Sequence, residues 1–260
     1  MSSSLTTPVV ASSGYRDAIE INNIAVQNLE YNNISSACKL LLPAVKSILV
    51  DYSSTTKSFC AESWKHTHFK WSRSIHGTKS KGGSNNAEPT VGSFLFSRAM
   101  YIQDLRPVRH SLSAQVVSSD IKAAIIYNAG LAHHLLAIKN NNDSTLLSKA
   151  RDMYRLSQAI LRDCNQKKKS SSKLLHKHFF HVAILNNMGQ ICYEFLDYTE
   201  SRHYFQNVEA NLLHIISRES RRKKHKTNPS VKKPPIFYPL DILGMMTNSL
   251  VDIPTAAPCA

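Results

Sequence analysis

The histidines are the first residues of this chain whose type and spacing could do chemistry. There are twelve, and His176, His178 and His181 come close together. On a helix that advances about 100° per residue, successive members of this group are turned by about 200° and 300°, so they share no face. A zinc site needs ligands that converge and a second shell that orients them. His66 and His68 form no better group. We therefore expect no metal site.

No motif indicates an enzyme. The phosphate-binding patterns G-x-x-x-x-G-K-[ST] and G-x-G-x-x-G are absent, and so are the G-x-S-x-G nucleophile turn and the H-E-x-x-H zinc pattern. The 18 acidic residues form no paired-carboxylate motif. We nominate no catalytic residue and no cofactor, and we expect a protein that is not an enzyme.

The basic residues are the second candidate for a functional site. The net charge of +14 is concentrated in residues 63–119, 164–181 and 219–233, which carry +6, +5 and +6, whereas the rest of the chain sums to −3. Clustered lysine and arginine favour polyanion binding or nuclear import. The densest cluster consists of Arg221, Arg222, Lys223, Lys224 and Lys226. Phe69 and Trp71 lie between basic residues and could stack on single-stranded nucleic acid, but we favour their docking on helices.

Three internal repeats supply the elements that would position such residues. Each begins with an asparagine two residues before a small residue early in an apolar helical run, and a second apolar run follows with internal offsets of four and three residues. The first runs contain Asn23-Ile24-Ala25, Asn128-Ala129-Gly130 and Asn187-Met188-Gly189; the second contain Ala37, Leu41, Ala44, then Ala150, Tyr154, Ser157, then Ser201, Phe205, Val208. Small residues let two helices approach closely. We therefore predict an all-α fold of three antiparallel helix pairs, over residues 16–52, 120–163 and 173–218.

The segments outside the pairs are expected to be less regular. We predict a disordered tail over 1–15, a long and partly disordered insertion over 53–119, and a basic, proline-rich tail over 219–260 with a possible capping helix at 240–250. Within the insertion, Phe94–Phe96 and Met100–Ile102 could pair as a hairpin or lie across the helices. Asp120 and Ser144 are the expected N-caps of the second pair. A turn stretched over Asn140–Ser144 would absorb its eight extra residues, and Pro43 should bend the second helix.

Composition indicates an intracellular protein, cytoplasmic or nuclear. The five cysteines are odd in number and scattered, which argues against a disulfide framework. No run reaches the roughly 18 apolar residues of a membrane span, and the first residues lack the pattern of a secretion signal.

The repeated pattern resembles the tetratricopeptide repeat, a helix-turn-helix unit of 34 residues. It also resembles the degenerate tetratricopeptide-like proteins of diatoms, in which a strand-like F-x-F-x-R-x-x-x-I segment, here Phe94 to Ile102, follows the first pair. The resemblance covers roughly 17–52 and 92–218, and it implies a short α-solenoid whose first helices line a concave groove.

Transferred by alignment, the resemblance implies a groove that is apolar and neutral-polar. Its candidate residues are Asn22, Val26, Leu29, Ala124, Tyr127, Asn128, Leu131, His134, Asn186, Asn187, Gln190 and Tyr193. The lysines and arginines of the chaperone-tail clamp subtype are missing. We expect an adaptor or scaffold that binds a peptide or helix of an unknown protein partner, unless other parts of the same chain fill the groove. Binding of RNA or DNA through the basic segments is the alternative.

Overall fold

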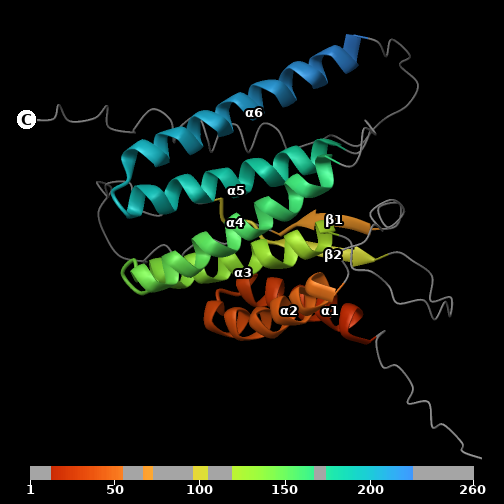
Figure 1. The fold of residues 1–260 in the computed structure, drawn as a ribbon, viewed down its shortest axis with the longest axis vertical. Coiled ribbons are helices and arrows are strands. Elements are labelled where there is room, and N and C mark those ends of the chain that lie inside the picture. Colours follow the sequence, from red (N-terminus) through yellow and green to blue (C-terminus); the bar gives the residue numbers. More distant parts are fainter. Residues whose placement is uncertain (1–12, 55–66, 73–95, 105–118, 167–173, 225–260) are drawn as a thin grey trace, which may run out of the picture.

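The computed structural model describes residues 13–54, 67–72, 96–104, 119–166 and 174–224, and these residues are mostly helical, as predicted (Figure 1). They contain six helices and two short strands. The elements are α1 (Ser13–Glu30), α2 (Ile34–Ser54), β1 (Thr67–Trp71), β2 (Met100–Asp104), α3 (Ser119–Lys139), α4 (Ser144–Gln166), α5 (Leu174–Glu194) and α6 (Tyr198–Lys224). Of the predicted tail over 1–15, residues 1–12 lie outside the described residues, and Ser13 to Tyr15 already belong to α1. The predicted capping helix over 240–250 also lies outside the described residues.

The helices form three hairpins, α1 with α2, α3 with α4, and α5 with α6, and these follow one another along the long axis (Figure 1). Contacts of α2 with α3 and of α4 with α5 join neighbouring hairpins. One continuous hydrophobic core runs through all three. Helix α3 lies at its centre, and its residues from Asp120 to Leu135 are all buried.

The central position of α3 explains its composition. By length and hydropathy alone α3 could cross a membrane, but 83% of its most apolar 18-residue window is buried inside the protein. A buried core helix passes the same test, because it is apolar on all sides.

Small residues set the distance between the helices of a hairpin. A Cβ atom added at Gly130 would lie 2.9 Å from Cε1 of Tyr154, and one added at Gly189 would lie 3.0 Å from Cζ of Phe205. Ser201 Oγ donates a hydrogen bond of 2.9 Å to the carbonyl oxygen of Gly189, so small residues also face each other. The aligned residues of the first hairpin, Ala25 and Leu41, are both buried. Each first-helix glycine therefore makes room for an aromatic ring of its partner helix.

The hairpin turns share one hydrogen-bond pattern. Asn33 N–H donates to the carbonyl of Asn28, and Asp197 N–H donates to that of Cys192, five residues back in both cases. The residues before them, Asn32 and Leu196, have φ of 60° and 59°. This geometry is the Schellman motif that ends many helices. The turns at Asn32-Asn33 and Leu196-Asp197 occupy the same place in the first and third repeats of the sequence, and they also have the same geometry.

The second hairpin differs in helix length, and the predicted stretched turn is wrong. Helix α3 runs nine residues past Gly130, whereas α1 and α5 end five residues past their small residues. Helix α4 begins six residues before Ala150, whereas α2 and α6 begin three residues before theirs. Only one of the eight extra residues lies in the turn. The others add about one helical turn to each helix, because an extended hairpin buries more apolar surface than a loop does.

Two predicted caps are also corrected. The cap of α4 is Asp143, whose Oδ1 accepts hydrogen bonds from the N–H groups of Thr145 and Leu146 at 2.8 and 3.3 Å. Ser144 is the first residue of the helix. Asp120 lies inside the first turn of α3, which begins at Ser119. Helix α2 continues through Pro43 to Ser54, where an end near residue 50 was expected.

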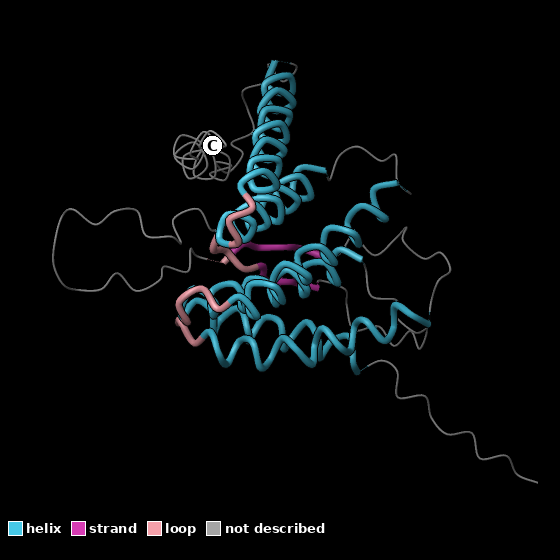
Figure 2. The backbone as a smooth tube through the Cα atoms, turned by 60° about the vertical axis from the view of Figure 1, so that its left-hand side comes forward, coloured by secondary structure: helices cyan, strands magenta, loops and turns pink. Residues whose placement is uncertain are grey.

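The insertion contains a strand that periodicity did not reveal. Strand β1 pairs antiparallel with β2, with Phe69 opposite Ile102 and Trp71 opposite Met100. The partner of β2 is thus β1, whereas residues 94 and 95 of the predicted hairpin lie outside the described residues. The described part, from Phe96 on, lies across the helices, as the alternative prediction has it (Figure 2). A five-residue strand carries too few alternations for a period to be recognised.

We predict that the glycine–aromatic pair of the third hairpin is energetically coupled. Gly189→Ala should destabilise the protein by about 1–3 kcal/mol although alanine favours helix, because the methyl group collides with the Phe205 ring. Phe205→Leu should also destabilise it. Together they recreate the Ala25–Leu41 combination, so their costs should not add when measured by urea unfolding in a double-mutant cycle. Additive costs would contradict the proposed packing.

Candidate peptide-binding groove

An extended segment of the chain crosses the faces of the three first helices. We call residues 96–102 the plug segment; it includes the start of β2. It contacts α1, α3 and α5, which belong to three different hairpins (Figure 2). Each of these helices contributes an asparagine side chain that binds both backbone groups of one residue of the plug segment.

Each asparagine binds both backbone groups of a single residue. Its Oδ1 accepts from the N–H group and its Nδ2 donates to the carbonyl oxygen. For Asn128 on Met100, both distances are 2.8 Å. They are 2.9 and 2.8 Å for Asn23 on Ile102, and 2.9 and 3.3 Å for Asn187 on Phe96. A side-chain amide has one acceptor and donors side by side, so it replaces the groups of a neighbouring strand.

The spacing of the bound residues follows from the repeat of the helices and from the alternation along an extended strand. We call Asn23, Asn128 and Asn187 the asparagine ladder; each stands two residues before the small residue of its repeat. In a strand, alternate residues present their backbone groups to the same edge. Residues 96, 100 and 102 therefore all face the ladder. The intervening residue, Arg98, is bound through its carbonyl oxygen by the Tyr127 hydroxyl at 3.1 Å.

The other edge of the plug segment is bound by β1 and its end. Ser72 N–H donates to the carbonyl of Ala99 at 2.8 Å, and Ala99 N–H donates to Ser72 Oγ at 2.9 Å. The plug segment is thus hydrogen-bonded on both edges. Buried backbone groups need such partners, because an unpaired one costs about 1–3 kcal/mol.

A buried polar network holds the ladder in place. Asn128 Nδ2 also donates to Asn22 Oδ1 at 2.8 Å, and Asn22 Nδ2 donates to the Met100 carbonyl at 3.2 Å. Asn187 Nδ2 donates to the Tyr154 hydroxyl at 3.1 Å. Burial raises the pKa of both Tyr127 and Tyr154, so both phenols stay neutral. The network is uncharged, and it orients amides without burying an ion.

Apolar contacts fix the side chains of the plug segment and of β1. Phe96, Met100 and Ile102 are buried in the core. The Trp71 ring lies edge-to-face with that of Phe96 at a centroid distance of 5.1 Å, and with that of Tyr127 at 6.1 Å. Phe69 and Trp71 both pack against the core. The prediction that they dock on the helices is confirmed.

The structure brings eleven of the twelve predicted groove residues into the buried interior. Four of them bond directly to the plug segment: Asn22, Tyr127, Asn128 and Asn187. Val26, Leu29, Ala124, Leu131, His134, Asn186 and Gln190 are buried around them. Tyr193 is partly exposed, and its ring contacts Tyr198 at 5.5 Å. The chain's own segment thus covers the face where a foreign peptide was expected.

The groove prediction missed Asn23, which binds Ile102. The signal was present, because Asn23 occupies the same repeat position as Asn128 and Asn187. Transfer from the tetratricopeptide pattern selected other positions on the first helix. Comparing the three repeats with one another would have found all three asparagines.

His134 is buried beneath the groove without a hydrogen-bond partner among the described residues. Neither ring nitrogen is paired, and the ring lies 6.1 Å from that of Tyr154. Burial lowers the pKa of His134 to about 3, so the imidazole is neutral. A buried polar group in this state reduces stability.

The basic cluster and the histidine group are only partly placed. Arg221, Arg222, Lys223 and Lys224 end α6, whereas Lys226 lies outside the described residues. Across the segments that the structure describes, no group of three potential metal ligands forms. His178 lies with its ring 5.7 Å from that of His214, and His181 faces a cleft described below.

Comparison with family models, curated proteins and solved structures finds no match to this chain.

We predict that Asn128 is a major determinant of stability. Asn128→Leu removes the acceptor of Met100 N–H, one of the two donors to the Met100 carbonyl and the donor to Asn22 Oδ1. It should therefore cost roughly 2–5 kcal/mol in urea unfolding and speed amide exchange at Met100. The control is Asn28→Leu, because Asn28 only bonds the Ile24 carbonyl at the surface of α1. If both variants cost the same, the ladder contributes nothing specific.

We predict that stability falls as pH drops below about 6.5. His134 and His181 have folded-state pKa values of about 3 and about 4, both lowered mainly by burial. Since the unfolded chain takes up protons that the folded chain excludes, each histidine should cost up to about 1.4 kcal/mol per pH unit between pH 6.5 and its folded pKa. His134→Leu should remove one such contribution from the pH profile of unfolding. An unchanged slope would argue against burial of this imidazole.

Proposed function

We propose that this protein is a non-enzymatic interaction scaffold whose first-helix face binds an extended polypeptide by its backbone. The asparagine ladder carries this proposal, because three equivalent positions each bind one residue of the same extended segment. We further propose that the three hairpins form a short α-solenoid of the tetratricopeptide type. The contacts between successive hairpins support that arrangement.

Backbone recognition suits a ligand of variable sequence. Every residue except proline offers the N–H and C=O pair that an asparagine binds. Selectivity then comes from the buried side chains at the positions of Phe96, Met100 and Ile102. The proposed partner therefore carries an extended segment with an aromatic residue followed at the fourth and sixth positions by aliphatic ones.

In the resting molecule the plug segment occupies this face. A tethered segment competes at an effective concentration of about millimolar or higher. A foreign segment must then bind more tightly, or exploit opening of the plug segment. The plug segment thus sets the affinity that a partner must exceed. A partner would make the same backbone hydrogen bonds and the same apolar side-chain contacts.

Polyanion binding remains the second proposal. It rests on the charge distribution and on the basic residues that end α6. Binding of RNA or DNA should weaken steeply with salt, because counterions are released when lysines and arginines meet phosphates. Salt-independent or absent binding would remove this proposal.

The groove proposal predicts that the face accepts a strand in trans. Met100→Pro removes the N–H group that Asn128 binds, which loosens the plug segment. A fluorescent peptide of residues 94–104 should then bind this variant in an anisotropy titration, and should bind the unchanged protein at least about tenfold more weakly, since the tethered segment competes.

Two controls distinguish binding in the groove from non-specific binding of the peptide. The same peptide with proline in place of Met100 should not bind, and adding Asn128→Leu to the Met100→Pro variant should abolish binding. A peptide that binds neither protein, or that binds independently of Asn128, would overturn the groove proposal. Circular dichroism of each variant reports whether its helices persist.

A further inference from the structure

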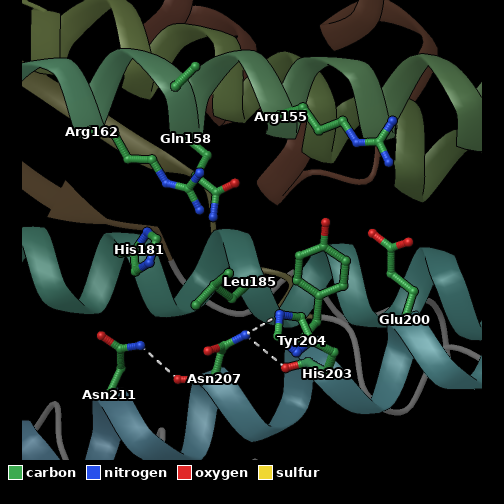
Figure 3. Close-up of a pocket in the computed structure, with 11 residues that line it drawn as sticks. Arg155, Gln158, Arg162, His181, Leu185, Glu200, His203, Tyr204, Asn207 and Asn211 are labelled. Carbon is green, nitrogen blue, oxygen red and sulfur yellow. Dashed lines mark hydrogen bonds between the residues drawn. The ribbon is translucent and has the colours of Figure 1, made fainter.

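A polar cleft lies away from the groove, between the second and third hairpins. Its volume is about 560 Å³, within the range of small-molecule sites. Figure 3 shows α4 along one side, α6 along the other and α5 between them. Residues spaced by one turn line it: Arg155, Gln158 and Arg162 on α4, and Glu200, Tyr204 and Asn207 on α6. None of them belongs to the predicted groove or to the basic cluster.

The two ends of the cleft differ in charge. At one end, Arg155 faces Glu200 across the cleft (Figure 3). Burial raises the pKa of Tyr204, and the nearby Glu200 carboxylate raises it further. At the other end, Arg162 lies beside Gln158 and above His181 (Figure 3). Arg162 has no carboxylate partner in the part of the chain that the structure describes. Arg162 is exposed to solvent, so its guanidinium is accessible to an anion that enters the cleft.

Gln158 provides the second observation that points to a ligand. Its side chain is only 7% exposed, and its Nε2 has no hydrogen-bond partner among the described residues. Burying an amide donor without a partner costs about 1–3 kcal/mol. Arg162 and Gln158 thus offer several N–H donors in one place. Such a donor-rich site favours an acceptor-rich anion.

We propose that this cleft binds a small polar ligand through an oxyanion, a carboxylate or a phosphate, held by Arg162 and Gln158. The guanidinium fork donates hydrogen bonds to two oxygens of such a group, and the amide N–H of Gln158 donates a further one. The volume of the cleft leaves room for the rest of the ligand, a polar part that would lie along α6 near Asn207. The proposal is independent of the groove, because Arg162 and Gln158 lie on α4 and no predicted groove residue lines the cleft.

The test is a titration of the full chain with two probes, inorganic phosphate and succinate, at constant ionic strength. Nuclear magnetic resonance of side-chain N–H groups should show saturable shifts at Gln158 and Arg162, and the stronger probe identifies the class of oxyanion. Arg162→Gln should weaken binding about tenfold, the effect of one charge-assisted hydrogen-bonding partner. Lys149→Gln removes the same charge from an exposed site on α4 outside the cleft, so it should leave binding unchanged.

Gln158→Leu separates binding from structure. Leucine has a similar size and needs no partner, so this variant should unfold at the same or a higher urea concentration and yet bind the probe more weakly. The proposal is overturned if neither probe gives saturable shifts, if Lys149→Gln weakens binding as much as Arg162→Gln does, or if Gln158→Leu binds as the unchanged protein does.

Discussion

The backbone of residues 96–102 is buried, and the need to pair its polar groups organises the rest of the structure. One edge finds partners in β1 and Ser72, and no strand among the described residues pairs with the other. Three asparagines from three helices take the place of that strand. Because each belongs to a different hairpin, the plug segment ties together elements that are up to 164 residues apart in sequence, from Asn23 to Asn187.

The same repeat position serves packing and polar recognition together. Two residues after each ladder asparagine, a small residue lets the second helix approach. The backbone of the first helix is then held close to its partner. The asparagine stands two residues earlier, which turns it by about 200°, so it is directed to the opposite side. Tyr154 links both functions, since its ring covers Gly130 and its hydroxyl accepts from Asn187. Close packing and a satisfied polar network support each other here.

The two proposed binding surfaces use opposite sides of the hairpins. The first helices α1, α3 and α5 bear the groove, which is neutral and filled by the chain itself. Helices α4 and α6 border the cleft, which is polar and is lined at one end by the exposed Arg162. A helix-pair scaffold can hold both, because each hairpin must bury only the stripes that face its partner and its neighbours. The helix faces that are not needed for this packing are then available for binding.

The sequence by itself determined the helix pairs, the equivalence of the first and third turns, and the neutral character of the first-helix face. These follow from local periodicity and from residue size, which short windows reveal. Only the tertiary structure decided what covers that face, where β1 lies, and that the second hairpin is lengthened in its helices and hardly in its turn. Asn23, Asn128 and Asn187 look like helix-surface amides until the strand that they bind is placed. Pairing between segments distant in sequence depends on the whole fold, so no local pattern records it.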